Sequence, residues 1–145
     1  MTIHAHENQT SPDISMEAGA SFAAKQYYFV KRDSAGLAQV ASAAGQRCTG
    51  ITQDAVASGA MARVRTTGRS YIVLGGTVAV GDLMKSDSAG KGVTAAGSIV
   101  DASGASATAA VSGPNVMGEC VVGGDAGQIG TIDLDSRGAV PTTAT

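Results

Sequence analysis

An all-β fold, a small barrel or sandwich with at most short helices, is what the 145-residue sequence predicts. Twenty glycines separate short runs rich in Val, Ile and Thr, which is the pattern of short strands joined by tight turns. Few Leu, Lys and Glu residues recur at helical spacing, so long amphipathic helices are disfavoured. With no Trp and only two Phe, the core must come mainly from Val, Ile, Leu, Met and Ala.

The first 21 residues form a distinct polar segment ahead of the body of the chain. Its larger apolar residues, Ile3, Ile14 and Met16, are isolated and follow neither a helical nor a strand period. Two interpretations stay open: a disordered terminus, or an extended N-terminal arm that becomes ordered on a partner. In either case, we expect residues 1–21 to be mobile in the free protein.

A hairpin is predicted near the start of the body, which comprises residues 22–145. The stretch QYYFVK, residues 26–31, is dense in aromatic and β-branched residues and predicts a strand. The stretch LAQVA, residues 37–41, returns after the turn DSAG. Asp33 suits the first turn position because its carboxylate can accept a backbone N–H two residues later. Gly36 suits the last because a positive φ costs glycine little.

Four more strands are predicted downstream. In MARVRT the side chain of Val64 faces one way and those of Arg63 and Arg65 the other, as in a strand with one solvated face. SYIVL, residues 70–74, is apolar throughout and predicts a central strand. The other two are expected in CTGITQ, residues 48–53, and in GGTVAVGDLMK, residues 75–85.

The turn motif occurs twice, because KRDSAG at residues 31–36 and KSDSAG at residues 85–90 differ in one letter. These copies lie 54 positions apart, whereas later matches such as Val64 with Ile132 lie 68 apart, so the second copy contains 14 additional residues. The sequence therefore predicts a duplicated β unit, about 26–66 and 80–134, with an inserted loop near 97–115.

The repeated turns are expected to be structural. Asp87 and Gly90 are the counterparts of Asp33 and Gly36. We expect both turns to have a similar backbone shape, to be exposed and to bind no ligand. A chance similarity in Gly-, Ala- and Ser-rich sequence is the alternative.

Charge and composition argue against several classes of function. The formal net charge is −2 with both signs scattered, so nucleic-acid binding has little support. No apolar run approaches a membrane span, and the N-terminus lacks the apolar stretch of a signal peptide. Cys48 and Cys120 are expected to be reduced, buried thiols, with a disulfide between them as the alternative.

No catalytic or metal site is predicted. His4 and His6, the two histidines, both lie in the N-terminal segment, away from any scaffold that could hold a general base beside a nucleophile. The spelling HAHE does not supply the preorganised ligands that a metal site needs. SAGKGV around Lys91 lacks the residues of a phosphate-binding loop. We therefore expect no cofactor and no enzymatic activity.

Four motifs occur in a characteristic order between residues 18 and 134. They are AGASFAAKQYYFVKRDSAG, CTGITQDAVASGAMARVRTTG, GGTVAVGDLMKSDSAGKGVTAA and MGECVVGGDAGQIGTIDL. In this order they resemble the small capsid decoration, or cement, proteins of tailed bacteriophages. The inserted segment and the residues after Asp135 depart from the family's compact pattern.

The resemblance implies a β-tulip-like domain that forms a homotrimer on the outer surface of an expanded capsid, after synthesis in the cytoplasm of the host bacterium. It implies binding to the major capsid protein, with the shell stabilised against internal DNA pressure. In such proteins the N-terminal arm often reaches the lattice, which makes Ile3, Ile14, Met16 and Phe22 candidate contact residues. The alternatives are another virion module, such as a fibre base or tail-tube-like protein, or a small hydrolase.

Overall fold

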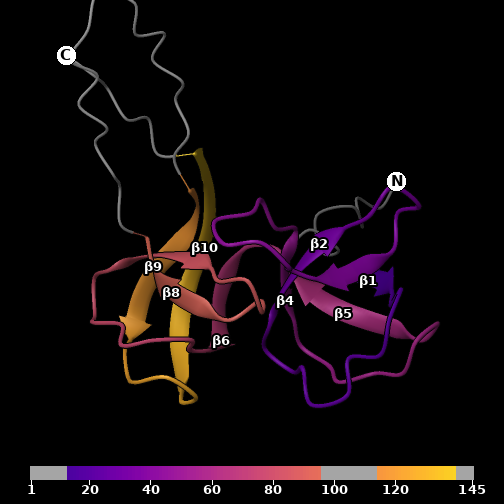
Figure 1. The fold of residues 1–145 in the computed structure, drawn as a ribbon, viewed down its shortest axis with the longest axis horizontal. Helices are drawn as coiled ribbons and strands as arrows, with labels where there is room; N and C mark the ends of the chain where they lie inside the picture. The colour runs from indigo at the N-terminus through magenta and orange to yellow at the C-terminus, as the bar shows by residue number, and fades with distance from the viewer. Residues whose placement is uncertain (1–12, 96–113, 140–145) are drawn as a thin grey trace, which may run out of the picture.

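The computed structural model describes residues 13–95 and 114–139 and is drawn in Figure 1. Over these residues the chain forms ten strands in two five-stranded antiparallel sheets, and it contains no helix. The prediction of an all-β fold is confirmed. The first sheet contains β1 (Asp13–Glu17), β2 (Phe29–Arg32), β3 (Ala38–Val40), β4 (Gly50–Thr52) and β5 (Met61–Arg65). The second contains β6 (Gly68–Val73), β7 (Leu83–Ser86), β8 (Gly92–Thr94), β9 (Asn115–Val122) and β10 (Ile129–Ala139).

The two sheets have the same topology. The first has the order β1-β5-β4-β2-β3 and the second the order β6-β10-β9-β7-β8, so each strand of the first corresponds to the strand five places later. Figure 1 shows the two sheets as adjacent lobes. We call residues 13–65 the first repeat and residues 68–139 the second. Each repeat begins one strand earlier than the predicted copies, 26–66 and 80–134, because β1 and β6 are also equivalent.

Hydrogen bonds outside the strands repeat as well. In each repeat the segment after the first strand lies beside the third strand and the turn before the last strand. In the first repeat the Gly19 N–H donates to the Ala38 carbonyl and the Gly59 N–H to the Ala18 carbonyl, at 2.9 and 2.8 Å. In the second, the Gly75 N–H donates to the Gly92 carbonyl and the Gly127 N–H to the Leu74 carbonyl, at 2.9 and 2.8 Å. The predicted inserted loop falls largely in residues 96–113, outside the described residues.

The two DSAG turns have the same local geometry. Asp33 Oδ1 accepts the N–H groups of Ala35 and Leu37, each at 2.9 Å. Asp87 Oδ1 accepts the equivalent N–H groups two and four residues later, at 2.8 and 2.9 Å. Gly36 and Gly90 both have φ of +83°, a conformation that favours glycine. The repeated letters therefore encode one backbone shape.

The surroundings of the two turns differ. Gly36 is exposed, and a Cβ added to it would meet nothing within 4 Å. Gly90 is buried, and its added Cβ would lie 2.5 Å from Val40 Cγ1 and 3.1 Å from the Phe29 carbonyl oxygen. The expectation that both turns are exposed is wrong for Gly90, because the second turn packs against the first repeat.

Part of the predicted arm belongs to the first sheet. Residues 13–17 form β1, which pairs with β5 in a register that sets Ile14 opposite Val64 and Met16 opposite Ala62. Met16 is buried, and Ala18, two positions on, is buried too. The predicted arm boundary at residue 21 is therefore corrected: residues 13–17 are the edge strand of the first sheet, and Met16 and Ala18 pack into the core below it. Residues 1–12, with Ile3, lie outside the described residues.

One apolar core joins the repeats. The larger cluster contains residues of both sheets: Phe29, Ala41, Cys48, Ile51, Ile72, Leu74, Val78, Met84, Met117, Cys120, Ile132 and Leu134. A smaller cluster lies within the first repeat: Met16, Ala18, Phe22, Val30, Ala38, Ala62 and Val64. Two sheets that share the larger cluster are expected to unfold together rather than as separate domains.

Truncation tests the corrected boundary of the arm. Deleting residues 1–12 removes no described strand, so the midpoint of thermal unfolding should change little. Deleting residues 1–20 removes β1 with Met16 and Ala18, and should destabilise the protein by roughly 3 kcal/mol or more, the cost of losing a large buried side chain. Calorimetry compares the two. Equal midpoints for both truncations would show that β1 contributes nothing.

Alanine at the two turn glycines separates backbone strain from packing. Gly36→Ala should cost about 1 kcal/mol, because only the positive φ is unfavourable. Gly90→Ala has the same φ and also drives a methyl group against Val40 and Phe29, so its loss of unfolding free energy should be clearly larger. Urea denaturation measures both values, and equal losses would contradict the packing of the second turn.

Candidate interaction surface

Large apolar side chains are exposed on the outer face of the second sheet. Along β6, Ser70 and Ile72 point inward, so Tyr71 lies on the outer face. Thr131 pairs with Tyr71 on one side and with Val122 on the other, which places these three side chains in one row across β6, β10 and β9. Tyr71, Val122 and Ile129 are 56%, 51% and 56% exposed. We call Tyr71, Val121, Val122, Ile129 and Thr131 the outer apolar face.

A β-bulge adds a second valine to this face. Thr131 pairs with Val122 and Ile132 with Cys120, which leaves Val121 as the additional residue of β9. A bulge changes the direction in which neighbouring side chains point. As a result, consecutive valines both line a shallow hollow of about 380 Å³, together with Arg65, Arg69, Ser70, Tyr71 and Thr131.

Ion pairs border the hollow. Arg69 Nε lies 2.9 Å from Asp133 Oδ1, and Arg65 Nε lies 2.7 Å from Asp13 Oδ1. A further bond, from Arg65 Nη1 to the Arg69 carbonyl at 2.9 Å, links the two arginines. Hydrogen bonds from Arg69 lower the pKa of the Asp133 carboxyl. The apolar centre is thus bordered by two ion pairs, as the polar rim borders the apolar centre of a protein interface.

The ring of Tyr71 is held in place by a second aromatic ring. Tyr27, from the segment before β2, meets it edge to face with ring centroids 5.3 Å apart. The Val73 N–H donates to the Tyr27 carbonyl at 3.0 Å, which fixes that segment beside β6. An aromatic side chain that is already ordered loses less entropy when a partner covers it.

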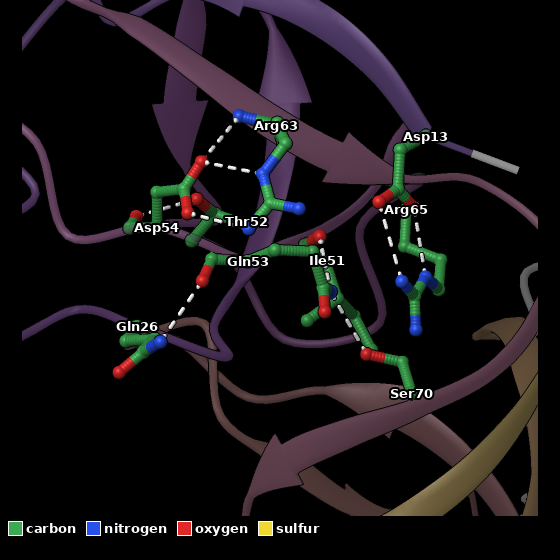
Figure 2. A network of polar contacts seen from close by, with 9 residues as sticks. All are labelled: Asp13, Gln26, Ile51, Thr52, Gln53, Asp54, Arg63, Arg65 and Ser70. Carbon is green, nitrogen blue, oxygen red and sulfur yellow. Dashed lines mark hydrogen bonds and ion pairs between the residues drawn. The ribbon is translucent and has the colours of Figure 1, made fainter. Parts of the chain in front are cut away.

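The first repeat offers a direct comparison, because its sheet has an equivalent outer face. The strand register matches Ser15 with Tyr71 and Arg63 with Thr131. Figure 2 shows Arg63 against Asp54, whose carboxylate accepts bonds of 2.9 and 3.1 Å from the guanidinium. These bonds lower the pKa of the Asp54 carboxyl. Met61 is the one large apolar residue exposed on the described outer face of β5.

The ion pair between the first and last strands of each repeat has its acidic and basic residues reversed from one repeat to the other. Asp13 on β1 pairs with Arg65 on β5, whereas Arg69 on β6 pairs with Asp133 on β10 at the equivalent positions. The scaffold is therefore conserved between the repeats, but the chemistry of the face is not. Only the second repeat combines Tyr71 with two adjacent valines, which marks its face as a candidate site for a protein partner.

A buried polar network connects the repeats beneath this surface. Gln53 Nε2 donates to Ser70 Oγ at 2.9 Å and to the Ile51 carbonyl at 3.1 Å, as drawn in Figure 2. Gln26 Nε2 donates to the Gln53 carbonyl at 2.9 Å. Among the described residues no buried side-chain nitrogen or oxygen lacks a hydrogen-bond partner. This network therefore has a structural role, because it links the two repeats through Gln53 and Ser70.

The predicted contact residues within residues 13–95 do not form one exposed surface. Met16 and Phe22 are buried in the smaller core cluster, and Ile14 is 37% exposed at the sheet edge. Asp33 and Gly36 lie in the exposed turn, and Asp87 and Gly90 in the turn that packs on the first repeat. The described residues contain no cluster of three His, Cys, Asp or Glu residues able to hold a metal ion. His4 and His6 lie outside them.

The outer apolar face is not predicted from the sequence, because SYIVL predicts a central strand. It is instead β6, at the edge of the second sheet, with only β10 as its neighbour. Apolar residues on both faces of an edge strand are a signal that could have indicated a partner surface. The valine pair of β9 could not have been assigned, because the bulge is not visible in the sequence.

Cys48 and Cys120 are both free and buried. Burial raises the pKa of the Cys48 thiol to about 11, and burial likewise raises the pKa of Cys120. Over the described part of the chain, no helix is long and apolar enough to cross a membrane.

Comparison with known proteins identifies a related fold. No protein-family model matches the chain, and no curated protein matches its sequence. Among solved structures it is similar to the N base of the head fibre protein gp8.5 of bacteriophage phi29, with a TM-score of 0.59. The match covers 88% of this chain and 96% of that chain at 16% sequence identity. At this identity the likeness shows a shared fold.

The thiol of Cys48 provides a test of the packing. At pH 8 in the native protein it should react with iodoacetamide roughly a hundredfold more slowly than an exposed cysteine, since the thiolate is the nucleophile. In denaturant both cysteines should react fully. Because the folded pKa is raised, stability is retained below the unfolded value of 9.0 and declines as pH rises toward about 11. Rapid native labelling of Cys48, identified by mass spectrometry, would contradict its burial.

Proposed function

We propose that this protein is a structural component of a bacteriophage virion and is attached to the outside of the head. The observation that carries the proposal is the fold likeness to the base of a phage head fibre, which covers nearly the whole of both chains. The ordered motifs between residues 18 and 134 support the same class of protein, because they resemble capsid decoration proteins.

In this proposal the protein binds the major capsid protein on the expanded shell as a homotrimer, and it stabilises the shell without catalysis. The outer apolar face supports a protein partner rather than a small ligand. It is shallow, lies on the surface of a sheet and is bordered by two ion pairs. Residues 1–12 can add a second contact to the lattice as an arm.

The energy of one such contact is modest. Covering the exposed halves of Tyr71, Val122 and Ile129 contributes on the order of 1 kcal/mol per side chain. Association itself costs roughly 4–15 kcal/mol in lost freedom of motion. A single face is therefore insufficient for tight attachment, whereas three faces on one trimer raise the effective concentration of each remaining contact. Trimeric attachment to a repeating shell matches this requirement.

A fibre base is the second candidate, and the fold likeness to the N base of a phage head fibre favours it. A base must bind the shell on one side and a fibre on the other. Electron microscopy of virions with and without this protein distinguishes the two. A cement protein leaves compact caps at many lattice positions and weakens the shell when absent. A fibre base carries projecting density that disappears with it.

Capsid binding is tested by placing a charge on the outer apolar face. Tyr71→Arg should weaken co-sedimentation with expanded empty capsids about tenfold or more, because a loss of 1.4 kcal/mol is already tenfold at one site and three sites act together. Ser15→Arg is the matched control, since Ser15 occupies the equivalent position of the first sheet. Equal binding by both variants would move the capsid contact away from this face.

A further inference from the structure

The two repeats contact each other through different sides. The second repeat contributes the turn 87–90, which packs on β2 and β3 of the first repeat. The Phe29 N–H donates to the Gly90 carbonyl at 2.7 Å, and Gly90 has no room for a Cβ beside Val40. The first repeat contributes Phe29, Val40 and the segment that follows β3.

That segment completes the contact. The Gly45 N–H donates to the Ser86 carbonyl at 2.8 Å, and the Gly45 carbonyl accepts the Asn115 N–H at 3.0 Å. The Ser86 hydroxyl donates to the Ala43 carbonyl at 3.3 Å. The contact is therefore head to tail. One repeat presents a turn and the groove beside it, and the other presents a strand surface and a following segment.

The first repeat has its own copy of the turn and groove. The turn 33–36 has the same backbone shape as 87–90 but is exposed. Beside it, a hollow of about 470 Å³ is lined by Arg32, Arg47, Cys48 and Thr49. In the strand correspondence Arg32 occupies the position of Ser86, and Arg47 the position of Asn115. In the second repeat those two positions are covered by the segment around Gly45.

The second repeat has its own copy of the strand surface. Leu83, Thr94 and Ala95 correspond to Phe29, Val40 and Ala41. The Ala95 N–H donates to the Leu83 carbonyl at 2.7 Å, just as the Ala41 N–H donates to the Phe29 carbonyl at 2.9 Å. Phe29 is fully buried under the second repeat, whereas Leu83 and Thr94 are partly exposed. The described part of the chain thus carries one unused turn and one unused strand surface.

We propose that the turn 33–36 of one copy of the protein binds the Leu83–Thr94 surface of a second copy and repeats the contact that already joins the two repeats. By this correspondence the Leu83 N–H of one copy donates to the Gly36 carbonyl of the next. The proposal deepens the homotrimer of the proposed function by assigning its interface. A head-to-tail contact can close into a ring, and three copies would arrange six similar repeats around its axis.

The identity of the partner follows from the molecule itself. The turn 33–36 has the same backbone shape as the turn 87–90, which packs on the strand surface at Phe29 and Val40. The chain also supplies an equivalent strand surface, at Leu83 and Thr94, for the turn 33–36 to bind. The exchange of Phe29 for Leu83 and of Val40 for Thr94 makes the surface between copies smaller and more polar. That difference suits surfaces that are exposed to water before assembly, whereas the contact within the chain is never separated.

Cysteine cross-linking tests the contact in the full-length protein without capsids. Ala35→Cys combined with Thr94→Cys should give covalent oligomers with a short bis-maleimide. Ala89→Cys with Val40→Cys places thiols at the equivalent positions within one chain, so this control should cross-link internally and remain monomeric on a denaturing gel. The single variant A35C should form no covalent oligomer, because two copies of the turn do not meet in a head-to-tail arrangement.

The outcomes are distinct. The inference is overturned if A35C with T94C stays monomeric while the control pair links, if A35C alone links, or if light scattering finds only monomers at every concentration. Leu83→Arg should abolish the oligomer. If light scattering gives this variant the same mass as the unmodified protein, the inference is also overturned. Cross-linked oligomers that fail to sediment with capsids would support this interface and contradict the proposed function. Capsid binding by a protein that stays monomeric would contradict this interface and support attachment to the shell.

Discussion

The packing of the second DSAG turn on Phe29 is the contact on which the rest of the molecule depends. Phe29 is fully buried, donates its N–H to Gly90 and belongs to the cluster that includes Ile72, Leu74 and Met84 of the second repeat. The second sheet therefore completes its core with a residue of the first. Any side chain at position 90 would separate the two, which explains why glycine is required there for packing as well as for its φ.

The sharing of a core also explains how the outer faces could diverge. The inward residues of both sheets are constrained by the clusters, and glycines at equivalent positions are constrained by close strand approach. A Cβ at Gly50 or at Gly118 would collide with the carbonyl of the strand alongside, Arg65 or Asp133. Outward residues carry no such constraint. One face has the Asp54–Arg63 pair, and the other has Val122 and Thr131 at the equivalent positions, beside Tyr71.

Features governed by local chemistry could be predicted from the sequence. Both DSAG turns, the all-β class and the existence of a duplication depend on turn residues and short apolar runs. Met16 shows where this reasoning fails, because its burial depends on pairing with β5, nearly fifty residues away, and a five-residue edge strand has little pattern of its own. Likewise, the outer apolar face requires the alignment of β6, β10 and β9 and a bulge at Val121, none of which is a local property.

The duplication gives a physical reason for assembly. When the turn of one repeat packs on the strand surface of the other, the other repeat's turn and the first one's strand surface are left without a partner repeat. In this chain the ends are the turn at Gly36 and the surface at Leu83, and the outer apolar face lies on a different part of the second repeat. The proposed self-association and the proposed attachment to a shell therefore use separate surfaces, so each copy in the proposed oligomer would present the same face to a partner.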